Sequence, residues 1–305
     1  MTTVDIRVPA TSANLGPGFD SLGLALSLYD HVRVTLDGDG ARVTVEGEGA
    51  GEVDTGEGHL VVRAMRKTYD RMGLPQPAGI RMHCRNSIPH ARGLGSSSAA
   101  VCAGILAARS LAAATHGDAV LSDDDVLALA TEMEGHPDNV APCLAGGLTI
   151  AWTEHDGAPR RVKLVPDAGV RPVVLVPATR LSTETARGLL PKDVPHKDAS
   201  FNAGRAALLI AALTRSPDRA LLLAATEDRL HQHYRAPAMP ESVDLVERLR
   251  AVGVPAVVSG AGPTVLAFST SDSQDLIAPE VGNDWHIQLM DVDPGGATVQ
   301  FPETR

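Results

Sequence analysis

A run of glycine and serine residues constrains this chain more than any other feature. The segment from Pro89 to Ala100 reads PHARGLGSSSAA and lies between a short apolar stretch and a long alanine-rich one. Its glycines allow a turn in which consecutive backbone N–H groups point into one space, and a following helix adds the positive end of its dipole. This arrangement is typical of a phosphate-binding loop. It is not a Walker A loop, because no Lys-Ser/Thr pair follows the second glycine, and Ser98 replaces the third glycine of the dinucleotide fingerprint.

Hydrophobic periodicity predicts an α+β protein of two layers. Alternating or short apolar runs predict strands over residues 4–8, 32–36, 42–46, 80–84, 172–176, 255–259 and 264–268. Helical spacing with capping residues predicts helices over residues 60–72, 98–114, 122–134, 183–190, 202–213, 218–226 and 242–252. A composition shift at residues 154–161 suggests a boundary between domains of residues 1–156 and 157–305.

Charge and cysteine content exclude several classes of protein. The formal net charge is −10 over 305 residues, which opposes non-specific nucleic-acid binding. Three separated cysteines without a C-x-x-C pair predict neither a disulfide framework nor a zinc ribbon. We find no basic leader followed by an apolar run, and no apolar stretch of about 18 residues that would suit a spanning helix. We therefore expect a cytoplasmic protein with no nucleic-acid or membrane partner.

Three motifs resemble the signatures of the GHMP kinase superfamily. Ile88–Ser97 resembles its nucleotide-binding signature, Val8–Gly23 its N-terminal motif, and Ser259–Thr264 its C-terminal glycine motif, which in the family packs beside the phosphate loop. Homoserine kinases have similar residues in the N-terminal motif and in the segments Glu132–Gly147 and Ser182–Arg187. The match runs in order from Arg7 to about Phe268.

The resemblance implies a fold and a reaction. It implies a ribosomal-S5-like N-terminal domain that binds the nucleotide, a ferredoxin-like C-terminal domain, and an active site between them. The implied reaction is transfer of the ATP γ-phosphoryl group to the side-chain hydroxyl of L-homoserine, a step of threonine biosynthesis, and the family also implies a homodimer.

The resemblance assigns nucleotide and metal ligands to individual residues. The metal ligands for Mg²⁺ are Ser97 and Glu132, with Glu134 close enough to be confused with the latter. Ala91 and Arg92 stand where many members have a glycine and a small residue, and His59 stands where asparagine is common and adenine contacts are expected. The implied nucleotide-binding residues are Pro89, His90, Ala91, Arg92, Gly93, Leu94, Gly95, Ser96, Ser97, Ser98 and Ala99.

Homoserine is a zwitterion with one free hydroxyl, so its pocket needs an anion clamp and an ammonium acceptor. The implied substrate ligands are Asn14, Asp20, His136, Arg187 and Arg235, with Asp20 the partner of the ammonium and the two arginines the partners of the carboxylate. The implied catalytic residues are Asn139, Thr183 and Arg187. Asn139 takes the position of the aspartate base of other members, with Asp138 adjacent, so we assign no general base and expect catalysis by positioning.

Two other functions compete with this interpretation. One is a GHMP kinase for an acceptor such as mevalonate or shikimate. Such an acceptor carries no amine, so Asp20 would have no ammonium group to bind. The other is a non-catalytic sensor of ATP and an amino acid, which predicts damage to the phosphate or metal positions. The segment Gly93–Ser97 and Glu132 are intact.

Overall fold

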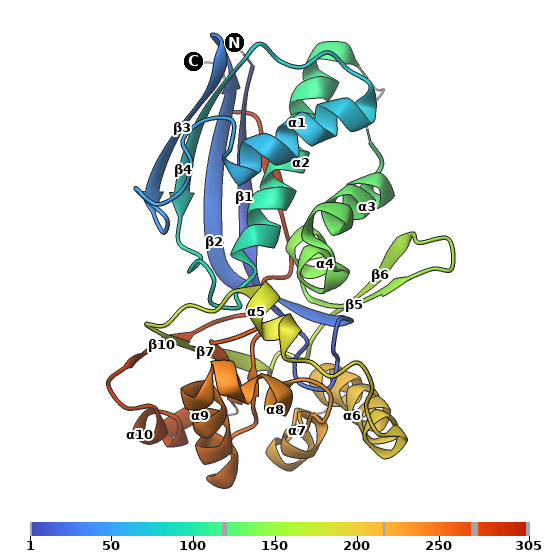
Figure 1. Cartoon of the computed structure of the whole chain (residues 1–305), viewed down its shortest axis with the longest axis vertical. Coiled ribbons are helices and arrows are strands. Elements are labelled where there is room, and N and C mark those ends of the chain that lie inside the picture. Colours follow the sequence, from blue (N-terminus) through green and yellow to red (C-terminus); the bar gives the residue numbers. More distant parts are fainter. Residues whose placement is uncertain (1, 118–120, 216, 270–273, 303–305) are drawn as a thin grey trace.

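The computed structural model describes residues 2–117, 121–215, 217–269 and 274–302, and it contains two sheets with their own helices (Figure 1). In these residues, the first sheet has the order β11-β1-β2-β4-β3, with β5 paired to β2 and β6 paired to β5. Its strands are β1 (Thr2–Ala13), β2 (Leu22–Leu36), β3 (Gly40–Gly47), β4 (Gly79–Asn86), β5 (Leu148–Thr153), β6 (Pro159–Leu164) and β11 (Thr298–Gln300). The two-layer α+β prediction is confirmed.

Helices cover one face of the first sheet, as Figure 1 shows. They are α1 (Leu60–Met72), α2 (Ser96–His116), α3 (Asp123–Glu134) and α4 (Pro137–Ala145). Alternate residues of β1, such as Val4, Ile6 and Val8, are buried and belong to the main core cluster. β3 runs parallel to β4 while the other pairings are antiparallel, so the sheet is mixed.

The long helix α2 is the centre of the first domain. It begins directly after Gly95, whose φ of 72° is left-handed, and its residues from Ala99 to Leu111 are almost all buried. Our expectation that no stretch is apolar enough for a membrane span is wrong for this helix, which meets the criteria of length and composition. In the structure 67% of its most apolar 18 residues is buried, so α2 is the core helix of the domain.

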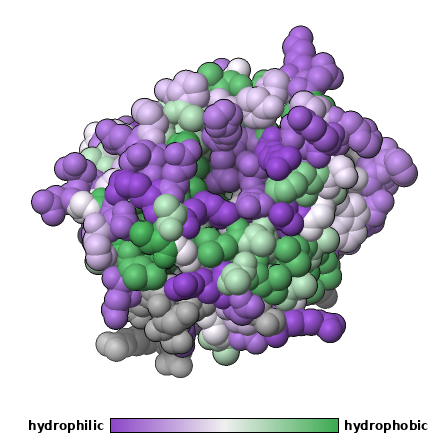
Figure 2. All heavy atoms as spheres, turned by 90° about the horizontal axis from the view of Figure 1, so that it is seen from below, coloured by the Kyte–Doolittle hydropathy of each residue, from purple (hydrophilic) through white to green (hydrophobic). Residues whose placement is uncertain are grey.

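The second sheet has the order β10-β7-β9-β8 and is covered on both faces. Leu175 and Val265 pack with α9 and α10 in one cluster, whereas Val174 and Leu266 join the main cluster with α6 and α7. Seen from below, the outer surface of this end mixes apolar and polar side chains (Figure 2). The elements here are β7 (Arg171–Pro177), α5 (Thr183–Gly188), α6 (His196–Arg215), α7 (Arg219–Ala225), α8 (Gln232–Arg235), η1 (Ala236–Ala238), α9 (Pro240–Ala251), β8 (Ala256–Val258), β9 (Val265–Ser269), η2 (Gln274–Leu276), α10 (Ala278–Val281) and β10 (Trp285–Leu289).

The strand pairing places the change of sheet later than residue 156. That residue lies in the turn between β5 and β6, which pair from Thr153↔Pro159 to Leu148↔Leu164. The chain passes to the second sheet between Leu164 and Arg171, and β11 returns to pair with β1. A polar, glycine-containing turn and a domain linker have the same composition, so composition alone placed the boundary inside a hairpin.

Candidate active site

Three segments that are far apart in the sequence meet between the two sheets. Ser259 Oγ lies 2.7 Å from the Gly93 carbonyl oxygen and 2.8 Å from Ser12 Oγ. The Asn14 amide donates to the Gly260 carbonyl over 2.9 Å. The C-terminal glycine motif therefore packs beside the phosphate loop and the N-terminal motif, as the resemblance implied.

Close packing explains the glycines of the loop. Gly93 and Gly95 have φ of 76° and 72°, and a Cβ on Gly95 would lie 2.0 Å from Thr11 Oγ1. Ala91 also has a positive φ, 54°, a conformation that glycine adopts without strain and alanine rarely does, so replacing the family's glycine by alanine leaves the turn in the same conformation at some cost in backbone strain. The Arg92 guanidinium donates to the carbonyls of Pro177 and Ala178 in the second domain, so its charge ties the domains together.

A cavity of about 390 Å³ opens next to the N-terminus of α2. Its walls include Val8, Val53 and Leu60, and it reaches Ser96 and Ser97. An apolar cleft of this size beside a phosphate loop suits the base of a nucleotide. The remaining lining residues are Asp30, Val32, Asp54, Gly58, His59, Val61, Cys84, Asn86, His90, Ala99 and Ala100.

Two polar residues of this cavity are buried. His59 is 7% exposed, its Nδ1 has no hydrogen-bond partner in the described part of the chain, and burial lowers its pKa. Asp30 Oδ1 accepts from the backbone N–H groups of Ser87 (2.6 Å) and Ile88 (2.9 Å). Burial raises the pKa of Asp30 from 3.8 to about 6, against the effect of these two hydrogen bonds. Asp30 thus anchors the segment that leads into the phosphate loop.

A second cavity of about 240 Å³ shares Ser96 and Ser97 with the first. It brings together residues from both domains, and every predicted substrate ligand except Asp20 is among its lining residues. The predicted residues in the lining are Asn14, Ala91, Gly93, Gly95, Ser96, Ser97, His136, Asn139, Thr183, Arg187 and Arg235.

The structure places Glu134, and not Glu132, beside Ser97. Ser97 Oγ donates to Glu134 Oε2 over 2.9 Å, and Glu134 lines the second cavity. Glu132 is absent from that lining; it binds Lys67 (2.7 Å) and Arg71 on α1, and these side chains lower its pKa. The two glutamates lie two residues apart on α3, so they project in different directions.

Asp20 and Arg187 form a two-point ion pair across the domains. Arg187 Nη2 and Nη1 donate to the two carboxylate oxygens over 2.7 and 3.2 Å. Asp20 has a left-handed φ of 54°, and its backbone N–H donates to Asn14 Oδ1. Asn14 therefore holds the turn that carries Asp20, in addition to contacting Gly260.

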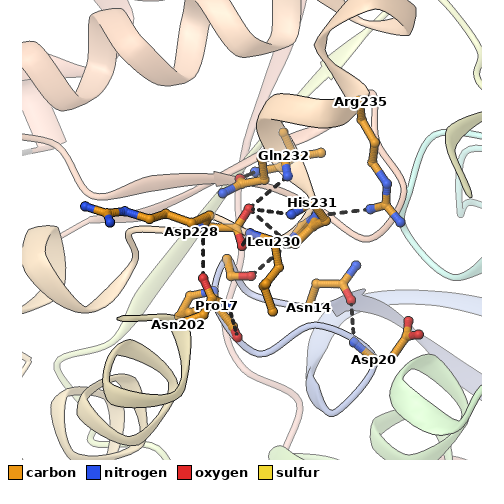
Figure 3. A network of polar contacts seen from close by, with 12 residues as sticks. Asn14, Pro17, Asp20, Asn202, Asp228, Leu230, His231, Gln232 and Arg235 are labelled. Atoms are coloured by element: carbon orange, nitrogen blue, oxygen red, sulfur yellow. Dashed lines mark hydrogen bonds and ion pairs between the residues drawn. The ribbon is translucent and has the colours of Figure 1, made fainter. Parts of the chain in front are cut away.

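Arg235 lies at the wall of the second cavity, and Figure 3 shows its side chain directed toward His231. Its side chain is 1% exposed, and Nη1 donates to His231 Nδ1 (3.1 Å) and to the Gly260 carbonyl (3.2 Å). Within the described residues Nε has no hydrogen-bond partner. Burial and the Arg187 charge lower its pKa, while Asp20, Asp228 and Asp138 act in the opposite direction. A buried guanidinium with an unused N–H group is suited to bind a carboxylate.

The other predicted residues have identifiable partners. His136 Nδ1 lies 2.6 Å from Asp138 Oδ1. Burial acts to lower the pKa of His136, but this hydrogen bond and the Asp138 charge outweigh it and raise the pKa. Asn139 Oδ1 accepts from Thr11 Oγ1 over 2.8 Å, which links α4 to β1. Thr183 is the first residue of α5 and faces the cavity with no bonded partner in the described residues.

Several residues of the site carry no sequence signal of their own. The Phe19 ring contacts three side chains. The guanidinium carbon of Arg187 lies 5.8 Å from the ring centre and that of Arg235 lies 5.5 Å from it. The His231 ring stacks on Phe19 with 5.2 Å between the ring centres. His231 is fully buried. Asp138 is also buried and becomes the partner of His136.

Comparisons with known proteins agree with this geometry. The family model "GHMP kinases N terminal domain" matches residues 59–147, and "GHMP kinases C terminal" matches residues 206–287. The homoserine kinase of Streptomyces coelicolor is 57% identical over 296 residues, covering 97% of this chain and 94% of that protein. The homoserine kinase of Clavibacter michiganensis subsp. michiganensis is 55% identical over 303 residues, covering 97% and 94%.

Solved structures show the same fold. The homoserine kinase from Cytophaga hutchinsonii superposes with a TM-score of 0.82 at 26% identity, covering 98% of each chain. The mevalonate kinase of L. major, at 16% identity and a TM-score of 0.67, shares the fold over 94% of this chain and 95% of that one. The two family models together match more than half of the chain and the curated relatives match nearly all of it, so this chain belongs to the GHMP kinase family and, within it, to the homoserine kinases.

Proposed function

We propose that this protein transfers the γ-phosphoryl group of ATP to the side-chain hydroxyl of L-homoserine, giving ADP and O-phospho-L-homoserine for threonine biosynthesis. One observation carries the proposal: the apolar cavity and the second cavity, whose lining includes charged side chains of both signs, share Ser96 and Ser97 of the phosphate loop. The base would occupy the apolar cavity, the phosphates would lie against the N-terminus of α2, and the acceptor would fill the second cavity.

The charges of the second cavity, together with Asp20, which lies outside its lining but pairs with the lining residue Arg187, match a zwitterion. Arg235 offers an unpartnered buried N–H group to the α-carboxylate, and Asp20 offers a carboxylate to the ammonium. Arg187 forms an ion pair with Asp20. This pair holds the Asp20 carboxylate at the domain interface before any ligand binds. An acceptor without an amine would gain nothing from Asp20.

Ser97 and Glu134 would hold Mg²⁺. A hydroxyl and a carboxylate are hard oxygen ligands, and Mg²⁺ in nucleotide sites keeps water and phosphate oxygens as its other ligands. Ser97 Oγ and Glu134 Oε2 lie 2.9 Å apart, so both oxygens are available at one place beside the phosphate loop. When bound, Mg²⁺ neutralises charge on the phosphates.

The chain's own residues would act by positioning. The homoserine oxygen attacks the γ-phosphorus, the bond to the β,γ-bridging oxygen breaks, and the hydroxyl proton leaves to phosphate or water. Thr183, free of bonded partners in the described residues, would contact the transferred group, while Asn139 keeps β1 and α4 together through Thr11. The homodimer and the cytoplasmic location remain predictions.

Release of ADP from MgATP, measured against homoserine, threonine, mevalonate and shikimate, tests the proposal. Homoserine should give the highest turnover, and no turnover with any acceptor would favour a sensor.

Asp20→Asn should raise the KM for homoserine by about 10- to 100-fold, since a charge-assisted contact contributes about 1.5–3 kcal/mol. It should scarcely affect 4-hydroxybutyrate, which lacks the amine, and asparagine tolerates the left-handed φ. An equal rise in the KM for homoserine and for 4-hydroxybutyrate would show that Asp20 stabilises the turn and does not bind the amine.

A further inference from the structure

His231 lies buried between the start of α8 and the turn of residues 14–20, with no exposed surface (Figure 3). Its Nε2 is 2.8 Å from the Gly16 carbonyl oxygen, and its Nδ1 is 3.1 Å from Arg235 Nη1. Its ring stacks on Phe19 with 28° between the planes. One side chain from the second domain thus contacts both Arg235 and the turn that carries Asp20.

The partners of the His231 ring determine its protonation. A guanidinium has only donors, so Nδ1 must accept from Arg235 and cannot carry a proton. Nε2 then carries the proton and donates it to the Gly16 carbonyl. The ring is therefore neutral and in a single tautomer.

The charges around the ring agree with a neutral imidazole. Burial and Arg235 lower the pKa of His231, and they outweigh Asp228, the hydrogen bond to Gly16 and Asp20, which act to raise it. The Arg187 guanidinium carbon, on α5, lies 5.8 Å from the centre of the same Phe19 ring. Protonation of Nδ1 would break the hydrogen bond to Arg235 and place two cations in contact.

The backbone of His231 is held as firmly as its ring. The Asp228 carboxylate accepts from the backbone N–H groups of Leu230 (2.9 Å), His231 (3.1 Å) and Gln232 (2.8 Å). The Asp228 side chain is fully buried. Buried hydrogen bonds of this kind keep a side chain in one orientation, which is what support of a binding residue requires.

We propose that His231 is a positioning residue for the acceptor: as a neutral imidazole it holds Arg235 and the Asp20 turn at one separation, matched to the carboxylate and ammonium of an amino acid. The inference rests on the proposed function. His231 lines neither cavity of the site, so it acts through Arg235 and the turn and not on the substrate itself.

Two substitutions separate the hydrogen bonds of His231 from its shape. His231→Phe keeps a flat ring against Phe19 and removes both hydrogen bonds, whereas His231→Gln keeps one donor and one acceptor. We expect His231→Phe to raise the KM for homoserine about tenfold or more and to leave the KM for ATP within about twofold. His231→Gln should recover part of the loss. His233→Phe, at an exposed position of the same helix, is the matched control and should behave as wild type.

A second measurement does not depend on the folding of the phenylalanine variant. As the pH falls below 6.5, the wild-type KM for homoserine should rise more steeply than that of His231→Gln, because only the imidazole can gain a charge next to Arg235. A parallel pH dependence in the two proteins would overturn the inference. So would an unchanged homoserine KM in a folded His231→Phe, or an equal rise in the KM for homoserine and ATP.

The acceptor panel keeps this test distinct from that of the proposed function. If homoserine is not the best acceptor, the proposed function fails, and the His231 variants are measured with the acceptor that is. Every acceptor of the panel carries a carboxylate for Arg235. Calorimetric affinity for the acceptor with ADP present gives the same comparison without turnover: weaker binding in His231→Phe supports the inference, and unchanged binding overturns it.

Discussion

Carboxylates of the same type have different partners in this site, and the partners determine what each can do. Glu134 accepts a hydrogen bond from Ser97 at the phosphate loop, whereas Glu132 is neutralised by Lys67 and Arg71. Among the residues that the structure describes, Asp30 has no cationic partner and accepts only from the backbone N–H groups of Ser87 and Ile88. A glutamate neutralised by two cations is poorly placed to bind Mg²⁺, and an unpaired buried aspartate costs stability when it ionises.

Exchange of each glutamate for glutamine tests the proposal that Glu134, and not Glu132, binds Mg²⁺. Glu134→Gln should lower turnover by about 100-fold or more and raise the Mg²⁺ concentration needed for half-maximal rate, because a charged ligand is lost. Glu132→Gln should change both by less than about threefold, since it removes only an exposed ion pair. Titration of turnover with Mg²⁺ at saturating ATP and homoserine measures both, and the reverse order of severity would restore Glu132 as the ligand.

Asp30 should make the stability depend on pH. Its pKa is raised from 3.8 to about 6 in the folded protein, so the folded state holds the proton more tightly than the unfolded state. Stability from this group is present below pH 3.8 and is lost as the pH rises through 6. Relative to Asp30→Asn, the wild type should lose up to about 3 kcal/mol of unfolding free energy between pH 4 and pH 7.

Urea unfolding across this pH range measures the effect of Asp30. The asparagine oxygen can still accept from the N–H groups of Ser87 and Ile88, so the comparison isolates the charge. Asp39→Asn, at an exposed position after β2, is the control and should run parallel to the wild type. A constant difference between wild type and Asp30→Asn at all pH values would contradict the prediction.

At the scale of one element, the short helix α5 positions two residues of the site. Ser182 Oγ accepts from the backbone N–H of Thr185 over 3.1 Å and caps the helix that carries Thr183 and Arg187. The Leu181 N–H donates to the Ala91 carbonyl, which joins the cap to the phosphate loop. A six-residue helix has few hydrogen bonds of its own, so its position depends on this cap.

Loss of the cap should therefore raise the KM for homoserine more than the KM for ATP. Ser182→Ala should cost about 1 kcal/mol locally and raise the KM for homoserine up to about fivefold, with the KM for ATP unchanged. Ser182→Thr retains a capping hydroxyl and should remain close to wild type. Steady-state kinetics with each substrate varied in turn provides the test, and equal effects of alanine and threonine would exclude a role of the cap.

At the scale of the whole molecule, the two domains are not independent segments of the sequence. β6 follows the expected boundary but pairs with β5, and β11 at the other end of the chain pairs with β1. The main core cluster also contains residues of both domains, such as Met65 and Phe268. A cut at residue 156 would leave the first sheet without two of its strands.

Truncation tests this dependence. A chain that ends at residue 295 lacks β11 and loses the contacts of Ala297 and Val299 with the main cluster. We expect its Tm to fall by about 2–6 °C while unfolding stays a single transition. The fragment of residues 1–156 should show no cooperative unfolding. An unchanged Tm in the first truncation, or a cooperative transition in the fragment, would show that β11 and β6 add nothing to the first domain.

Elements with strong local signals were predictable in both place and extent. The helix expected over residues 60–72 is observed over Leu60–Met72, because its amphipathic spacing and the stop at Gly73 are local. The segments β5, β6, β10 and β11 are short and gain their hydrogen bonds from other strands, and the sequence did not predict them. α4 was missed because it begins at Pro137 and contains Pro142.

The sequence by itself determined the chemistry of this protein, because a phosphate loop, its glycines and its capping helix are local and can be recognised in one continuous segment. It also supplied the residue types that a zwitterionic acceptor requires. Only the tertiary structure decided which of these residues meet: Asp20 with Arg187, Ser97 with Glu134, and His231 with Arg235 and Gly16. These pairs join different elements, and ion pairs and hydrogen bonds act over about 3 Å. Their partners are therefore set by how the two domains pack, which no local pattern encodes.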